Sequence, residues 1–127
     1  MNGAAVTSQR QRQVAELLRE DISRILREKV RDPRIGFVTI TEVDVTADLR
    51  QARIYVSVLG SHEEQGAALE ALEGAAHYVR SQLAHGWTLR YLPEIEFRWD
   101  PSLERAARVL ELLDQVKQEE AADDAAT

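Results

Sequence analysis

The sequence contains no cysteine, which excludes a disulfide, a thiolate nucleophile and a thiolate metal site. It has three histidines, His62, His77 and His85, and no two of them are spaced as in a helical zinc site. No apolar run approaches the roughly 20 residues that cross a membrane, and the first residues lack the apolar core of a signal peptide. We therefore expect a cytoplasmic protein with no metal, no cofactor and no membrane contact.

Positive charge is also scarce, because 16 Lys and Arg face 22 Asp and Glu and give a net charge of −6 at pH 7. Residues 1–60 hold 10 cations and 8 acids, whereas residues 61–127 hold 6 and 14. A faintly basic N-terminal half permits RNA binding without predicting it, since a strongly basic domain is the clearer sign. Residues 118–127 are predicted to be a disordered acidic tail, and residues 1–7 a flexible N-terminus.

Between these ends, residues 8–117 are predicted to form one domain with a single core. Ser8 and Gln11 have the spacing of a capping box, which predicts a helix start. The apolar residues that follow recur at steps of three and four, as on one face of a helix: Val14, Leu17, Leu18, Ile22, Ile25, Leu26 and Val30. The helix ends before Pro33, because the residue before a proline is disfavoured in the helical region.

Two strands are predicted next, over residues 37–46 and 51–59, because both segments are rich in β-branched residues. The short connection between them predicts an antiparallel hairpin. The apolar phase of the first strand changes along its length, so we expect a bulge near Thr41 and Glu42 or burial on both faces.

A second capping box, at Ser61 and Glu64, predicts the start of another helix. This helix is predicted to end at His85-Gly86, where glycine suits a left-handed cap. A third strand alternates apolar Ile95, Phe97 and Trp99 with polar residues. Asp100-Pro101 then opens a last helix, with Asp as N-cap. The apolar stripe of that helix is Leu103, Ala107, Leu110, Leu113 and Val116.

This order of elements predicts an α+β fold: a three-stranded mixed sheet with helices packed on one face. A helix connects the second and third strands, so a right-handed crossover and a parallel pair are possible. The arrangement is compatible with a type II KH-like domain, although periodicity alone does not separate it from other small α/β sandwiches.

The sequence contains no pattern of residues that is typical of a catalytic site. We therefore expect no enzyme, no catalytic residue and no small-molecule substrate. Glu94 and Glu96 share a strand face, but solvent-facing residues explain them more simply than a carboxylate pair. Gly60-Ser61 precedes a helix, yet no Gly-Lys-Ser/Thr follows to make a phosphate loop.

Arginine remains as the candidate binding residue, since 14 of the 16 cations are arginine, which suits bidentate phosphate contact. Scattered arginines that serve solubility are an equally good explanation from the pattern alone. The candidates for phosphate contact are Arg24, Arg27, Arg31, Arg34, Arg50, Arg53, Arg80 and Arg90.

Three motifs resemble the bacterial ribosome-binding factor A family. They are Asp32-Pro33-Arg34-Ile35-Gly36, then Asp48-Leu49-x-x-Ala52-x-Ile54-Tyr55-Val56, and last Leu92-Pro93-Glu94-Ile95-x-Phe97-x-x-Asp100-x-Ser102-x-Glu104. Three motifs in order at the family's spacing make a strong match, and it extends from about residue 12 to about residue 113.

The resemblance implies a type II KH-like fold in which an Ala-x-Gly kink between two helices faces RNA. The matching positions here are Ala75, Ala76 and His77, so a histidine stands where the family has glycine. Glycine adopts positive φ readily, whereas histidine only tolerates it, so we expect a weaker kink or a bend shared with Gly74.

The resemblance further implies a non-enzymatic ribosome biogenesis factor. Such a protein binds the small (30S) ribosomal subunit and its 16S rRNA during late maturation and rRNA processing, and it supports growth in the cold. We expect a monomer when the protein is free. The alternative is a small α+β module for protein interaction or ligand sensing without RNA binding, which leaves the three ordered motifs unexplained.

Overall fold

The computed structural model describes residues 7–36 and 38–126. Most of the predicted flexible N-terminus, the first residue of the predicted first strand and the last residue of the predicted tail therefore lie outside the described residues. The elements in chain order are α1 (Gln9–Glu28), the 3₁₀ turn η2 (Pro33–Ile35), β1 (Val38–Val45), β2 (Gln51–Val58), α2 (His62–Gly86), β3 (Glu94–Trp99) and α3 (Ser102–Ala126). This order confirms the sequence prediction.

The three strands form one mixed sheet in the order β1-β2-β3. β1 and β2 are antiparallel, and their register shifts between Ile40 and Glu42, which confirms the predicted bulge. β2 and β3 are parallel, with Gln51 opposite Glu94, because α2 carries the chain back between them. The parallel pairing places the starts of β2 and β3 at the same end of the sheet.

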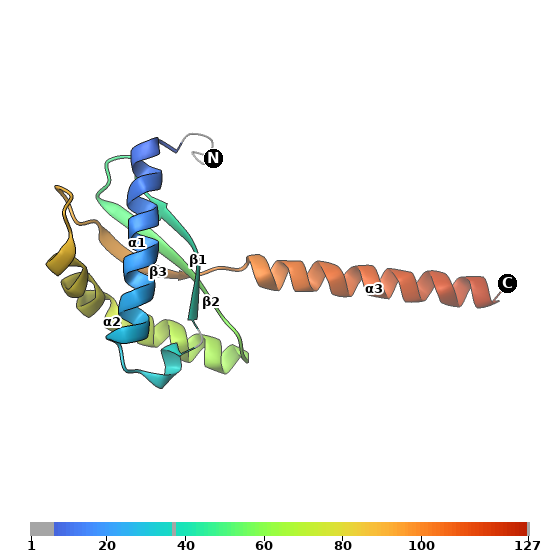
Figure 1. Ribbon diagram of the computed structural model, residues 1–127. Coiled ribbons are helices and arrows are strands. Elements are labelled where there is room, and N and C mark those ends of the chain that lie inside the picture. The colour runs from blue at the N-terminus through green and yellow to red at the C-terminus, as the bar shows by residue number, and fades with distance from the viewer. Residues whose placement is uncertain (1–6, 37, 127) are drawn as a thin grey trace.

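One face of the sheet carries the core, since α1 packs on β1 and α2 packs on β3 (Figure 1). The largest fully buried side chains come from both helices, the central strand and the residue before β3: Leu18, Ile22, Ile54, Val56, Leu72, Val79 and Pro93. Leu17 was predicted for the buried stripe of α1 but is 39% exposed, since it lies at the edge of that stripe. The opposite face is polar, with exposed Asp44, Arg53 and Glu96 on its three strands.

The helix ends follow local side-chain chemistry. Both predicted capping boxes form: Gln11 N–H donates to Ser8 Oγ at 3.0 Å, and Glu64 N–H donates to Ser61 Oγ at 3.2 Å. The predicted left-handed cap at Gly86 does not form, because the only positive-φ glycine of the described residues is Gly60 and the cap of α2 is extended.

α2 is one helix of 25 residues that runs through Ala75, Ala76 and His77 without a break. Neither Gly74 nor His77 has a positive φ. The resemblance implies a kink between two helices, but no residue at these positions adopts the left-handed conformation that such a kink requires. Histidine at position 77 accounts for this, because a residue with a Cβ favours continued helix over positive φ.

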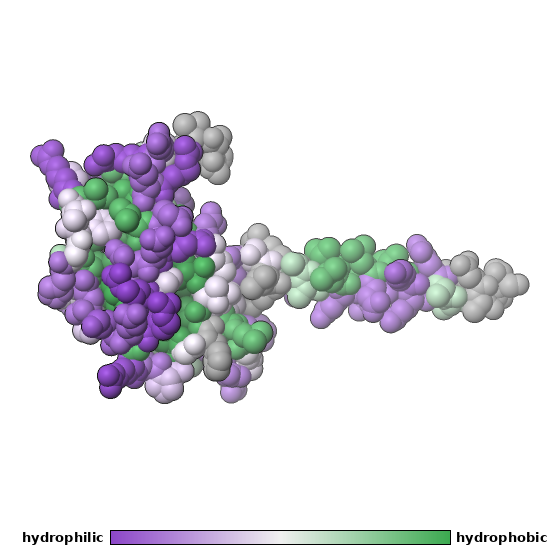
Figure 2. Space-filling view, in the orientation of Figure 1, coloured by the Kyte–Doolittle hydropathy of each residue, from purple (hydrophilic) through white to green (hydrophobic). Residues whose placement is uncertain are grey.

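α3 projects away from the sheet as a separate rod (Figure 1), although its apolar stripe was predicted as part of the domain. Its large apolar side chains in the described part are exposed: Val109, Leu110, Leu112, Leu113 and Val116. Figure 2 shows them gathered along one side of the helix. The side chain of Leu103, also predicted for this stripe, lies outside the described residues. The open face of the sheet is mainly polar, so among the described residues it gives these side chains little apolar surface to pack against.

The helix continues to Ala126, through residues where the sequence predicts a disordered acidic tail. Alanine is the commonest residue of this stretch, and it has the highest helix propensity of all residues.

Candidate nucleic-acid interface

Six of the eight predicted arginines form two groups at opposite ends of α1, whose 20 residues span roughly 30 Å. We call Arg24, Arg27, Arg31 and Arg34 the helix-break arginines, since they lie on the last turns of α1, on the segment that follows it and on η2. The other group lies near the start of α1, where Gln11 Nε2 donates to Val45 O at 2.8 Å. There the β1–β2 turn and the segment before β3 come together.

This second group, which we call the Tyr91 cluster, consists of Arg50, Arg90 and Tyr91. The guanidinium carbon of Arg50 lies 4.1 Å from the centroid of the Tyr91 ring, and that of Arg90 lies 5.2 Å from it. These are cation–π distances, and they hold two positive charges against one aromatic ring. The cluster was not predicted as a unit, and Tyr91 was not among the predicted residues.

The backbone fixes the position of the cluster. Glu94 N–H donates to Arg50 O at 2.9 Å, which extends the parallel pairing of β2 and β3 by one residue. Trp87 Nε1–H donates to Tyr91 O at 2.8 Å and ties down the segment that precedes β3. The backbone at Tyr91 is therefore held in place while the residue remains 41% exposed.

Neither Arg50 nor Arg90 forms an ion pair with a carboxylate of the described residues. The nearest acid in the turn, Asp48, has its pKa lowered by hydrogen bonds from the Thr46 hydroxyl and the Arg50 N–H, with the Arg50 charge adding to them. That carboxylate is thus engaged by the turn itself. A guanidinium that stacks on an aromatic face keeps its N–H edges available for a phosphate.

The helix-break arginines are in a different state, because three of the four have acidic partners. Arg24 lies 3.5 Å from Asp21, and Arg27 lies 3.9 Å from Glu28. These two pairs are exposed and loose, and pairs of this kind contribute little to stability.

The tightest pair in this group is Arg34 with Asp32, whose Nη2 and Oδ2 atoms are 2.7 Å apart. Arg34 Nε also donates to Asp32 Oδ1 at 3.0 Å, so the contact is bidentate. These bonds lower the pKa of Asp32 and raise the pKa of Arg34. Arg31 has neither an ion pair nor a side-chain hydrogen bond with the described residues.

Arg80 has a structural role, because its guanidinium contacts other parts of the protein. Its guanidinium donates to Pro93 O at 3.2 Å and to Leu92 O at 3.0 Å, and it lies 3.4 Å from a carboxylate oxygen of Glu94. It therefore fastens α2 to the segment that enters β3. Its role as a phosphate ligand stays a prediction. A phosphate would have to bind the N–H groups of Arg80 that these contacts leave free.

The remaining predicted residues lie apart from both groups. Arg53 is exposed on the open face of the sheet, in register with Asp44 and Glu96. On α2, Ala75 and Ala76 are half-buried and His77 is exposed. Their part in RNA binding stays a prediction.

Two residues at or near the predicted groups were missed by sequence reasoning, Tyr91 and Arg19. Arg19 Nη2–H donates to Thr41 O at 2.7 Å, at the bulge of β1. Tyr91 could have been found from the sequence because it directly follows Arg90, and an aromatic residue beside a cation is typical of RNA-binding surfaces. Its contact with Arg50 follows from the parallel register of β2 and β3, which brings together residues that are far apart in sequence.

Among the described residues, no cluster of three or more His, Asp or Glu has the geometry to hold a metal ion. A search of the same residues finds no helix long and apolar enough to span a membrane.

Comparison with known proteins gives a consistent result. Residues 10–113 match the family model described as Ribosome-binding factor A. The chain is 49% identical over 119 residues to ribosome-binding factor A of Thermomicrobium roseum, an alignment that covers 94% of this chain and 92% of that protein.

Two structural neighbours come from Thermus thermophilus. The crystal structure of its ribosome-binding factor A is 26% identical, with a TM-score of 0.60, and the match covers 69% of this chain and 93% of that one. A homology model of the Thermus thermophilus factor, fitted into the cryo-EM map of its complex with the 30S subunit, has a TM-score of 0.55 and 26% identity, over 76% of this chain and 97% of that one.

Proposed function

The chain belongs to the ribosome-binding factor A family, and we propose that it is a non-enzymatic ribosome biogenesis factor. It binds the small (30S) ribosomal subunit and its 16S rRNA during late maturation and rRNA processing, and it supports growth in the cold. It acts in the cytoplasm as a monomer when free, with no cofactor and no small-molecule substrate.

The observation that carries this proposal is the family match over residues 10–113, which spans the whole sheet and both helices that cover it. Its support includes the Thermus thermophilus relative, which has been fitted into a map of a 30S complex. The alternative of a protein-interaction or ligand-sensing module has no comparable support, because it leaves the family match unexplained.

The mechanism requires only that the protein bind two states of the subunit with different affinity. The Tyr91 cluster offers guanidinium edges to the phosphates of an immature RNA surface, and the helix-break arginines add charge at the other end of α1. When the RNA matures and the spacing of its phosphates changes, fewer of these contacts can form together. The factor then dissociates without a chemical step.

Co-sedimentation on a sucrose gradient tests the proposal. The purified full chain is mixed at low ionic strength with small subunits from cells arrested in assembly, with mature small subunits, and with large subunits as the control. We expect the chain to migrate with the immature small subunits, more weakly with the mature ones, and not with large subunits. Recovery only in the soluble fractions contradicts the proposed function.

A further inference from the structure

We propose that the cleft between the C-terminal half of α1 and the start of β1 binds one unpaired nucleotide of RNA. This inference rests on the proposed function and adds to it a binding pocket at a defined place. The cleft is separate from the Tyr91 cluster, since it lies at the opposite end of α1.

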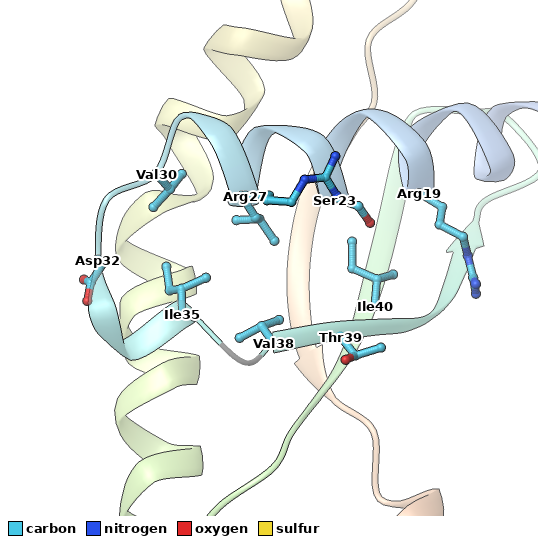
Figure 3. Close-up of a pocket in the computed structure, with 11 residues that line it drawn as sticks. Arg19, Ser23, Arg27, Val30, Asp32, Ile35, Val38, Thr39 and Ile40 are labelled. Atoms are coloured by element: carbon cyan, nitrogen blue, oxygen red, sulfur yellow. The ribbon is translucent and has the colours of Figure 1, made fainter.

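The cleft has a volume of about 440 Å³, within the range of pockets that bury small ligands. Its floor is apolar and is formed by side chains from α1, from η2 with the loop before it, and from β1. Figure 3 shows α1 along one side of the cleft and β1 along the other, with lining side chains between them. The floor residues are Leu26, Val30, Ile35, Val38 and Ile40. Leu26, Ile35 and Ile40 are buried, so the face of a planar base would stack mainly on the half-buried Val30 and Val38.

The rim is polar and comes largely from one side of α1. Arg19, Ser23 and Arg27 follow at intervals of four residues, so they lie on one helical face above the floor (Figure 3). The Ser23 hydroxyl has no hydrogen-bond partner among the described residues, and it can both donate to and accept from a base edge.

The two rim arginines supply charge for the phosphates that flank a base. Arg19 is held over β1 by its bond to Thr41 O, which leaves its other N–H groups available. Arg27 is largely exposed, and its contact with Glu28 is loose at 3.9 Å. The acid that lines the cleft, Asp32, is held in the bidentate pair with Arg34, so its charge is largely compensated.

An apolar floor, one free hydroxyl and two rim cations match a nucleotide better than they match a peptide. A peptide strand needs a row of main-chain partners, whereas a nucleotide needs a stacking surface, an edge contact and a phosphate contact. The base has to be unpaired, because a duplex hides both its faces and its edge. A cleft of this size thus selects an extruded or single-stranded base.

Amide NMR spectra of the ¹⁵N-labelled full chain test the proposal with three probes: hexauridylate, uridine 5′-monophosphate and poly-glutamate. With hexauridylate we expect the amide signals of Ser23, Arg27, Gly36 and Thr39 to shift. Uridine monophosphate should shift the same signals with roughly tenfold weaker affinity, because it lacks the second flanking phosphate. Shifts at these positions with poly-glutamate alone, or equal affinity for the mononucleotide, contradict an RNA site.

A pocket-filling substitution gives the second readout. Ser23→Phe places a ring over the floor, and it should weaken hexauridylate binding roughly tenfold, the effect of losing one stacked base. Ser81→Phe, on an exposed turn of α2, is the matched control and should leave the affinity unchanged. Equal binding by the two variants overturns the proposal. If Ser23→Phe does not fold, the wild-type shifts decide the matter alone.

The outcome is separable from that of the proposed function. Wild-type protein that co-sediments with immature small subunits but shows no shifts around the cleft contradicts only the nucleotide site. Failure to co-sediment contradicts the broader proposal.

Discussion

The two groups of arginines at the ends of α1 carry the same charge but are held in different ways. In the Tyr91 cluster an aromatic ring orients Arg50 and Arg90 and leaves their N–H edges without a carboxylate partner in the described residues. At the helix break, Arg34 is held in a bidentate pair with Asp32, whereas Arg24 and Arg27 form only loose exposed pairs. Arg31 has no ion pair with the described residues. We expect a phosphate to bind the first group directly, whereas at Arg34 it has to displace an acid.

This contrast shows that a count of arginines is a poor measure of an RNA-binding surface. What matters is whether another group already satisfies the guanidinium. A tight exposed pair such as Arg34 with Asp32 adds little to the stability of the fold, yet it removes donors from the surface. We therefore expect the Tyr91 cluster to be a stronger phosphate site than the helix break, although the sequence analysis placed more candidate residues at the break.

The largest effect is expected from the double variant Arg50→Gln and Arg90→Gln. Each substitution removes a charged hydrogen-bond donor that has no carboxylate partner in the described residues, so binding to immature small subunits should weaken roughly tenfold or more. Sedimentation at fixed low salt measures the change. The matched control is Arg24→Gln with Arg34→Gln, which alters the net charge equally and should weaken binding much less. Equal losses for both doubles contradict the comparison.

A smaller effect is expected from Tyr91→Leu, which keeps every charge but removes the ring that orients two of them. Exposed cation–π contacts are worth about 0.5–1 kcal/mol each, so affinity should fall several-fold. The salt dependence of binding should stay unchanged, because the number of cations is the same. Tyr78→Leu, an exposed tyrosine of α2, is the control. A change in salt dependence with Tyr91→Leu argues against a purely orienting role.

Removing the acidic partner of an arginine should increase the affinity for immature small subunits rather than decrease it. Asp32→Asn frees Arg34 and keeps a side chain that can cap η2, so we expect affinity for immature subunits to rise about twofold. Asp114→Asn on α3 changes the net charge equally and serves as the control. A rise of the same size in both variants assigns the gain to net charge alone, which removes Arg34 from the interface.

The smallest expected effect is a change in the pKa of Asp32. Hydrogen bonds from Arg34 hold the pKa of Asp32 below its ordinary value of 3.8. A lowered pKa contributes stability that is present above pH 3.8 and is lost as the pH falls through the folded pKa. Carboxyl ¹³C NMR should therefore give a midpoint below 3.8 for Asp32. In Arg34→Gln the midpoint should rise toward 3.8 without reaching it, because the side-chain bonds are lost but the backbone N–H of residue 34 still donates to Asp32 Oδ1.

Asp48 is the internal control for this titration, because its pKa is lowered first by the Thr46 hydroxyl and then by the Arg50 N–H. Its midpoint should not move in Arg34→Gln. An Asp32 midpoint that also stays in place argues that the pair with Arg34 does not form in solution.

The sequence predicts much of the fold because its signals are local. The capping boxes at Ser8 and Ser61 depend on residues three apart, and the bulge near Thr41 depends on the alternation of one strand. The parallel pairing of β2 and β3 needed only the length of the helix between them. Each of these predictions requires neighbours in sequence and no knowledge of tertiary contacts.

The parts that failed or were missed depend on tertiary contacts. The stripe of α3 has the periodicity of a buried helix, but no apolar surface of the described domain receives it. Tyr91 gains its importance from Arg50, which lies far away in sequence and is brought close by the sheet register. Whether an arginine is paired likewise depends on which acids the fold brings within reach, as Arg80 with Glu94 shows.

The most direct test of the central claim is the salt dependence of binding to immature small subunits for the wild type and the two arginine doubles. Plots of log affinity against log salt should lose a slope of roughly 0.7 for each phosphate contact removed from single-stranded RNA. We predict a slope flatter by about 1.4 for Arg50→Gln with Arg90→Gln, and a near-wild-type slope for Arg24→Gln with Arg34→Gln. Parallel slopes for the wild type and the first double contradict the claim that the Tyr91 cluster contacts RNA.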